Sequence, residues 1–255
     1  MISVIIPARN EEKRIAAALG AILKQDHPDY EVIVVDNGST DQTSKIASSF
    51  PGVKVLREDH MGTMWACERG RREAKGDIIV RMDADCIPRT DWLSRGASHF
   101  ADPRVTAVSG PYEYFDYSPL FQFITDVIQQ DLYWLSSNVL QWLGGNGVMI
   151  GGNSFMRASA MEKIGGFDTS IVFYGDDTDI AKKMSRLGHL VFDRKLILPT
   201  SARRFMRQGI MATIKPYFLG FWGAVFNASN RPEYDGSSVE TASKAVDPKD
   251  AKTAL

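Results

Sequence analysis

Short apolar runs alternate with helix-length amphipathic stretches along the first half of the chain. The runs are rich in Val and Ile, have the length of buried strands, and cover residues 2–6, 31–35, 53–56, 78–82 and 105–109. An alternation of strands and helices predicts a parallel sheet with right-handed crossovers and helices on its faces. We therefore expect an α/β fold with a Rossmann-like, mostly parallel central sheet.

Polar clusters follow three of these runs directly. They occupy residues 7–11, residues 36–41, and Asp83 with Asp85. Carboxyl ends of parallel strands share one edge of a sheet, where ligands collect, so the three clusters are expected to converge. Two carboxylates leaving a buried strand are hard oxygen ligands that suit Mg²⁺ or Mn²⁺ carrying a phosphate-bearing substrate. A solvated turn would explain the Asp pair alone, but not the convergence.

The alternation breaks after Pro111. Residues 117–143 carry apolar side chains at helical spacing, interrupted by polar residues 129–131. This stripe is expected either to pack on the sheet or to contact an apolar acceptor. Residues 151–157 follow, and they have the pattern of a loop that enters a short strand.

Three aspartates lie at the start of a predicted helix that runs to about residue 187. Asp176 and Asp179 fit the N-cap and N3 positions, where negative charge is favourable. Capping leaves Asp177 unexplained. A carboxylate between two others is disfavoured as an anion, which raises its pKa and makes it a better proton acceptor near neutrality.

The C-terminal part combines basic and aromatic residues. Arg203 and Arg204 are suited to binding a diphosphate, or form a solvated surface. Residues 210–226 are apolar and aromatic but too interrupted to span a membrane, so they either lie at a membrane interface or pack on the domain. Residues 231–255 have few apolar side chains, which predicts a disordered tail.

Composition limits the expected partners and the expected cellular location of the protein. A net charge of -1 gives no global field that would attract nucleic acid. The two cysteines form no disulfide framework, and the chain starts on a strand-like run with no signal-peptide pattern. We expect a cytoplasmic protein, with a peripheral position on the inner face of the membrane as the alternative.

The motifs in their order and spacing resemble the family 2 glycosyltransferases with the GT-A fold. They are VIIPARNEE, EVIVVDNGSTD, the DAD after a strand, GGNSFMR with GGFD, and GDDTD before a helix, across about residues 2–205. The resemblance implies transfer of a sugar from a UDP- or GDP-linked donor to an acceptor hydroxyl, with inversion at the anomeric carbon. Expected acceptors are a sugar, a lipid-linked sugar or a polyprenyl phosphate, in cell-surface polysaccharide or glycolipid synthesis.

The resemblance also implies roles for individual residues. The residues expected to contact the nucleoside are Pro7, Ala8, Glu11, Asp36 and Asn37. Asp83 and Asp85 resemble the metal-binding motif, either both on the cation or Asp85 alone with Asp83 turned toward the ribose. Asp177 resembles the general base, and Arg203 or Arg204 the arginine that faces the leaving diphosphate. Asn37 stands where the family often has Asp, which leaves the base of the donor open.

Four segments are expected: a nucleotide-sugar half (1–110), an acceptor and catalytic-base half (111–205), an apolar helical segment (206–230) and the tail (231–255). Two other functions compete with a glycosyltransferase. A sugar-phosphate nucleotidyltransferase would carry a Gly-rich loop after the first strand, and residues 7–12 contain no Gly. A catalytically silent nucleotide-sugar-binding protein would not need Asp83, Asp85 and Asp177 together.

Overall fold

The computed structural model describes residues 1–142, 144, 146–171 and 175–209. Each apolar run of the first half forms a strand. In order, the elements are β1 (Ile2–Ala8), α1 (Ile15–Ile22), β2 (Tyr30–Asp36), α2 (Thr43–Ser48), β3 (Val53–Arg57), α3 (Thr63–Glu73), β4 (Ile78–Met82), α4 (Trp92–Ser98), the short 3₁₀ helix η1 (His99–Ala101) and β5 (Val105–Ser109).

The second half contributes more helix than strand. Its described elements are β6 (Tyr112–Tyr114), α5 (Pro119–Asp126), the π-helix η2 (Val127–Tyr133), α6 (Trp134–Trp142), β7 (Asn153–Arg157), α7 (Ala158–Lys163), α8 (Asp176–Ser185), β8 (His189–Phe192), β9 (Leu198–Thr200) and α9 (Arg203–Gln208). Residues 206–208 are thus the end of α9. The predicted apolar segment of residues 210–226 and the predicted tail lie outside the described residues.

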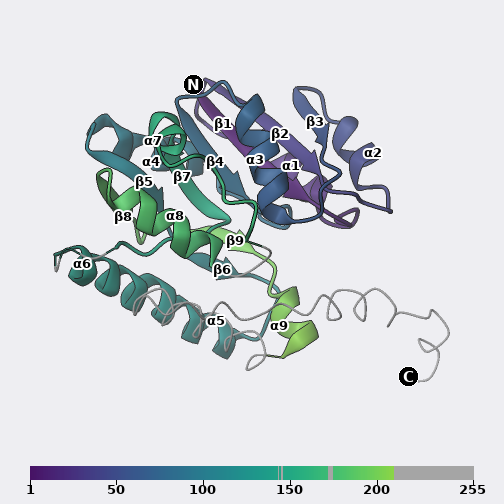
Figure 1. The fold of residues 1–255 in the computed structure, drawn as a ribbon. Coiled ribbons are helices and arrows are strands. Elements are labelled where there is room, and N and C mark those ends of the chain that lie inside the picture. The colour runs from purple at the N-terminus through teal and green to yellow at the C-terminus, as the bar shows by residue number, and fades with distance from the viewer. Residues whose placement is uncertain (143, 145, 172–174, 210–255) are drawn as a thin grey trace.

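The central sheet has the strand order β3-β2-β1-β4-β7-β5-β8, and a small parallel sheet pairs β6 with β9 (Figure 1). All neighbours in the central sheet are parallel except β7, which runs antiparallel to β4 and β5. The prediction of a mostly parallel sheet is confirmed. Because β7 runs backwards, its first residue Asn153 pairs with Met82 at the end of β4, which brings the loop before β7 beside Asp83.

Successive strand residues point to opposite faces of the sheet, and both faces are buried. On β1, Ile6 packs into a core covered by α1, α2 and α4, whereas Ile5 packs into a second core covered by α3, α7 and α8. Two buried faces explain why the strands read as continuous apolar runs rather than as alternating patterns.

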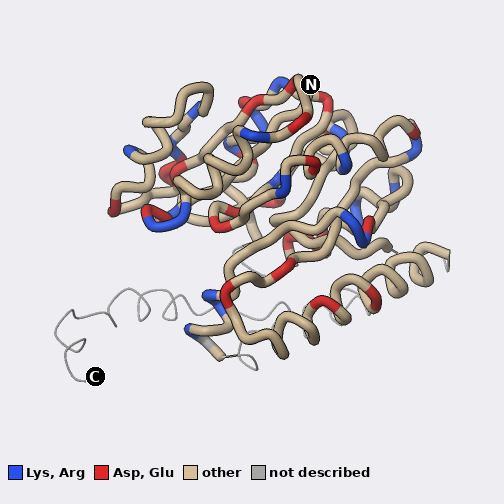
Figure 2. The backbone as a smooth tube through the Cα atoms, turned by 180° about the vertical axis from the view of Figure 1, so that it is seen from behind, with Lys and Arg blue, Asp and Glu red and all other residues tan. Residues whose placement is uncertain are grey.

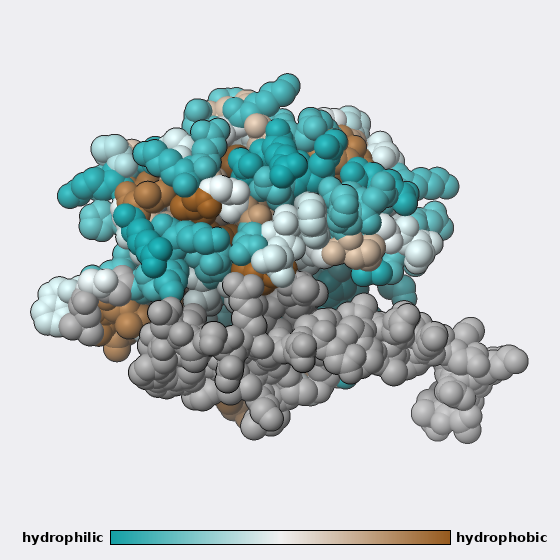
Figure 3. Space-filling model, viewed as in Figure 1, coloured by the Kyte–Doolittle hydropathy of each residue, from teal (hydrophilic) through white to brown (hydrophobic). Residues whose placement is uncertain are grey.

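The helices α5, η2 and α6 follow one another without a break and lie beneath the small sheet (Figure 1). The helical segment packs on the central sheet, as one of the two interpretations expects, because Gln141 Nε2 donates to the Leu190 carbonyl on β8 at 2.8 Å, but the apolar stripe does not make this contact. Its large side chains are between 36% and 84% exposed at Leu120, Ile124, Val127, Ile128, Leu135, Val139 and Trp142. Figure 3 shows apolar surface beside α6, at the lower left.

Charge is nearly absent from this helical segment. Figure 2 shows basic and acidic residues over the whole body of the molecule, whereas the helix is mostly tan. In the sequence, the charged residues between 119 and 142 are Asp126 and Asp131. The polar interruption predicted from the sequence coincides with η2. There, the Gln129 side chain is buried and its Oε1 accepts a hydrogen bond from the Tyr112 N–H at 2.8 Å. Within the described part of the chain, no helix is both long and apolar enough to cross a membrane.

Candidate active site

The predicted polar clusters meet at the carboxyl edge of the central sheet. Asp36 ends β2, Asp83 and Asp85 follow β4, and Glu11 lies in the loop after β1. The Glu11 N–H donates to Thr43 Oγ1 at 2.7 Å, which fixes this loop against the start of α2. The expected convergence of the three loops is therefore present in the fold.

Arg203 joins two of these clusters. Its Nε lies 2.9 Å from Asp85 Oδ2, its Nη1 donates to Glu11 Oε2 at 2.7 Å, and its Nη2 donates to Glu11 Oε1. Burial lowers the pKa of Arg203, but its bonds to Glu11 and the charge of Asp85 outweigh this and leave the pKa above its ordinary value. The guanidinium is thus a fixed positive charge shared by two carboxylates.

Asp85 is the more enclosed member of the Asp pair. Its side chain is 10% exposed, and Thr200 Oγ1 donates to its Oδ1 at 3.4 Å. Burial raises the pKa of Asp85 to about 6, the charge of Arg203 opposes this, and the charges of Asp83 and Glu11 add to it. A carboxylate that is desolvated in this way gains from any cation placed against it.

Asp83 is more open, with a side chain that is 38% exposed. Its Oδ2 accepts a hydrogen bond from the Tyr112 hydroxyl at 3.0 Å. Gly152 lies so close that a Cβ there would be 2.1 Å from the Tyr112 hydroxyl oxygen and 2.3 Å from Asp83 Oδ2. Sequence reasoning missed Tyr112 and Gly152, and the paired glycines before β7 were the available signal for close approach.

Asp177 lies in the first turn of α8. Its Oδ1 accepts the Thr178 N–H at 2.8 Å. Burial raises the pKa of Asp177 to about 7, and the neighbouring charge of Asp176 adds to this, while the Thr178 N–H and the charge of Arg81 oppose it. The expected direction of the pKa shift is present, although burial is a larger cause than the neighbouring carboxylate.

The predicted capping roles of Asp176 and Asp179 are wrong. Gly175 is the N-cap, with a φ of 93°, and no side-chain capping hydrogen bond is made. Asp176 is the first residue of the helix, where its Oδ2 accepts from Arg81 Nη1, and Asp179 pairs with Lys183 at 2.6 Å. Asp176 therefore lies against Arg81 of β4, which the spacing of acidic residues alone does not reveal.

The expected nucleoside pair, Asp36 and Asn37, is buried. Asn37 Nδ2 donates to the carbonyls of Glu58 at 3.1 Å and His60 at 2.7 Å, and its Oδ1 accepts the Gly62 N–H at 2.8 Å. Asn37 thus holds the loop between β3 and α3. Asp36 Oδ1 accepts a long hydrogen bond of 3.3 Å from the Ser39 N–H.

The remaining sequence-predicted residues flank this edge. Pro7 pairs with Val35 in the sheet, and Ala8 ends β1, where its carbonyl accepts the Asn37 N–H at 2.9 Å. Arg204 follows Arg203 on α9 and is half-buried. Pro7 and Ala8 therefore lie at the carboxyl end of β1, and α9 carries both arginines, of which Arg203 reaches Glu11 and Asp85.

The carboxylate oxygens at the carboxyl edge of the central sheet fit a divalent cation that is also bound by a substrate. No group of three or more His, Cys, Asp or Glu side chains within the described ranges could hold a metal ion alone. Asp83 and Asp85 nonetheless offer hard oxygen donors. Mg²⁺ and related ions are commonly bound by one or two carboxylates plus substrate phosphates, so the pair fits such an ion.

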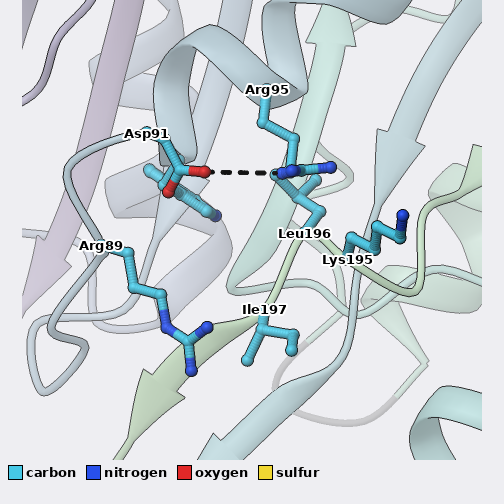
Figure 4. Close-up of a pocket in the computed structure, with 7 residues that line it drawn as sticks. Arg89, Asp91, Arg95, Lys195, Leu196 and Ile197 are labelled. Atoms are coloured by element: carbon cyan, nitrogen blue, oxygen red, sulfur yellow. Dashed lines mark ion pairs between the residues drawn. The ribbon is translucent and has the colours of Figure 1, made fainter.

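A cavity of about 220 Å³ opens elsewhere, between α4 and the loop before β9 (Figure 4). It is lined by Arg89, Asp91, Trp92, Arg95, Lys195, Leu196 and Ile197. The Arg95 guanidinium faces Asp91 at 3.7 Å, and Arg89 pairs with Glu113 at 2.9 Å. It contains none of the predicted site residues, so the candidate site remains at the carboxylate edge.

The chain is similar to known glycosyltransferases. It is 31% identical over 214 residues to the glycosyltransferase AglE of Haloferax volcanii, covering 80% of this chain and 68% of that protein. It is 26% identical over 209 residues to a Methanococcus voltae dolichyl N-acetyl-alpha-D-glucosaminyl phosphate 3-beta-D-2,3-diacetamido-2,3-dideoxy-beta-D-glucuronosyltransferase, covering 77% of this chain and 57% of that protein.

Solved structures show the same fold. The mannosyltransferase PcManGT of Pyrobaculum calidifontis, solved with GDP-Man and Mn²⁺, superimposes with a TM-score of 0.66 at 22% identity, over 91% of this chain and 65% of that one. The family model for glycosyl transferase family 2 matches residues 3–165. The chain therefore belongs to glycosyltransferase family 2, and its sheet and flanking helices form the GT-A fold.

Proposed function

We propose that this chain transfers a sugar from a UDP- or GDP-linked donor to an acceptor hydroxyl, with inversion at the anomeric carbon. One observation carries the proposal. Asp177, a half-buried carboxyl with a raised pKa, belongs to the same constellation as the Asp83 and Asp85 pair, because Arg81 reaches from β4 to the neighbouring Asp176. Such an arrangement combines a proton acceptor with ligands for a charged leaving group.

The reaction assigns one role to Asp177. As the acceptor oxygen forms its bond to the anomeric carbon, the bond from that carbon to the donor diphosphate breaks and its electron pair leaves with the nucleoside diphosphate. Asp177 takes the proton of the acceptor hydroxyl, for which it must be ionised. Its raised pKa makes it a stronger base than an ordinary Asp.

The donor is proposed to lie along the edge formed by β1, β2 and β4. Pro7, Ala8, Glu11, Asp36 and Asn37 would border the nucleoside, with Asn37 acting through the loop that it holds. Asp83 and Asp85 would hold Mn²⁺ or Mg²⁺, which when bound supplies a Lewis acid for the leaving diphosphate.

Positive charge from α9 would assist the same leaving group. Arg203 already lies against Asp85 and Glu11, and Arg204 is its neighbour in the helix. Both would bind the departing nucleoside diphosphate with planar guanidinium donors.

The acceptor is proposed to be lipid-linked, either a lipid-linked sugar or a polyprenyl phosphate. The name of the Methanococcus voltae relative includes a dolichyl N-acetyl-alpha-D-glucosaminyl phosphate, which is a lipid-linked sugar. The exposed apolar side chains from Leu120 to Trp142 would provide a surface for such a lipid, and a peripheral position on the membrane would follow from it. Residues 210–226 would add to this contact.

A donor panel tests the proposal. The full chain is heated with UDP- and GDP-sugars in the presence and absence of Mn²⁺, and we expect one donor class to raise Tm only when Mn²⁺ is present. Transfer from that donor is then measured to polyprenyl-phosphate-linked sugars in lipid vesicles and to soluble oligosaccharides. Absence of any Mn²⁺-dependent donor shift would contradict the proposal. Donor binding without transfer to any acceptor would instead support a silent binding protein.

A further inference from the structure

Arg81 is a buried charge in the middle of a central strand. Four of the five residues of β4 are apolar, and Arg81 is 8% exposed. A guanidinium at such a place is costly unless anions pair with it. Its Nη1 donates to Asp176 Oδ2, and its Nη2 lies 3.9 Å from Asp83 Oδ1. The Arg81 side chain therefore connects Asp83, the carboxylate on the donor side of the candidate site, to the first turn of α8.

The surroundings of Arg81 leave it little freedom. A Cβ at Gly151 would lie 2.8 Å from Arg81 Nη1 and 3.4 Å from Asp176 Oδ2, so only glycine admits the pair without displacement. Asp176 is itself enclosed, with a side chain that is 12% exposed. The bridge is therefore held by packing on both sides, and Asp177 follows it directly in the chain.

We propose that Arg81 is a positioning residue that fixes the distance between the base Asp177 and the donor-side carboxylate Asp83. The inference rests on the proposed function, in which Asp177 takes the acceptor proton. Arg81 touches neither substrate in this proposal. It sets the base helix against the end of β4, so that the acceptor oxygen faces the anomeric carbon when the donor is bound.

A purely structural ion pair would stabilise the fold without tuning the chemistry, so the test needs readouts that separate the two roles. Arg81→Gln removes both the planar guanidinium and the positive charge, whereas Arg81→Lys keeps the charge without the planar guanidinium. Asp176→Asn removes the carboxylate that pairs with Arg81. Arg71→Gln is the matched control, because Arg71 pairs with buried Glu68 at 2.7 Å, away from the candidate site.

In the full chain with Mn²⁺, donor and acceptor, we expect Arg81→Gln to lower kcat by about 100-fold, as misplacement of about 1 Å does, while donor Kd changes little. Among the residues that the structure describes, the titratable and charged groups that face Asp177 are Asp176, Arg81 and Tyr133. The charge of Arg81 lowers the pKa of Asp177, so its loss should raise that pKa. The acid limb of the kcat/KM profile should then move to higher pH. Arg81→Lys should restore the position of that limb but only part of kcat.

Arg81→Gln and Asp176→Asn should also be non-additive in kcat, since they remove one bridge. Arg71→Gln should lower Tm without changing kcat or the pH profile. If Arg81→Gln resembles Arg71→Gln in both respects, Arg81 is structural only and the inference is wrong. Should Arg81→Gln not fold, Arg81→Lys with an unaltered kcat would overturn it equally. A wild-type chain that transfers no sugar would refute the proposed function itself, which is a distinct result.

Discussion

Replacement of Asp177 by Asn is expected to lower kcat by about 10²- to 10⁴-fold, the range that a general base contributes. The donor Kd in the presence of Mn²⁺ should stay nearly unchanged, because an asparagine keeps the shape of the side chain and donor contacts come from other loops. Initial rates of transfer and a calorimetric donor titration measure the two quantities. Equal loss of donor binding and turnover would make Asp177 a structural residue.

The same variant has an expected effect on stability. The folded state raises the pKa of Asp177 from 3.8 to about 7, so it binds the proton more tightly than the unfolded chain does. Its contribution to stability is therefore present at low pH and is lost as the pH rises through about 7. Above that pH, Asp177→Asn should have a higher Tm than the wild type. The control is Asp179→Asn, which loses the pair with Lys183 and should keep kcat.

Replacement of Asp85 by Asn is expected to weaken Mn²⁺-dependent donor binding by about 100-fold or more, since a bound metal ion contributes several kcal/mol. Asp85 is the enclosed carboxylate, and its partner Arg203 would keep only Glu11. Calorimetric titration of the donor with and without Mn²⁺ measures the effect. Binding of both Mn²⁺ and donor with wild-type affinity would show that Asp85 is not a ligand.

Asp83→Asn is the informative companion, because it separates two arrangements of the pair. If both carboxylates hold the cation, Asp83→Asn should reduce Mn²⁺ affinity as much as Asp85→Asn does. If Asp83 faces the ribose instead, Mn²⁺ affinity should persist while donor affinity falls. The Tyr112 hydroxyl donates to Asp83 Oδ2, while Asp83 Oδ1 lies 3.9 Å from Arg81 Nη2, beyond hydrogen-bonding distance, so Oδ1 can still take either role.

Much of the sheet could be predicted because a strand that is buried on both faces has a continuous apolar sequence. Ile5 and Ile6 are apolar although they point to opposite cores, which distinguishes a central strand from an edge strand. No comparable sequence pattern indicates the antiparallel direction of β7. A strand of five residues has the same local pattern in either direction, and its pairing depends on β4 and β5, which are distant in sequence.

The candidate site could be predicted only where the motif was local. Asp83 and Asp85 follow one strand, and Asp177 stands out among three acidic neighbours. The bridge from Arg203 to Glu11 joins residues 192 positions apart, and Arg81 reaches Asp176 across 95 positions. Such contacts depend on how loops meet at the sheet edge. Periodicity likewise revealed the apolar stripe before Trp142, but periodicity does not say what lies against a stripe.

The dependence of kcat/KM on pH tests the central role of Asp177 most directly, because this profile reports the ionisation of the free enzyme's base. The active form is the carboxylate, so kcat/KM should rise with pH and reach half its maximum near pH 7. A profile that stays flat down to about pH 4, the ordinary range of an aspartate, would contradict a carboxyl with a raised pKa acting as the base.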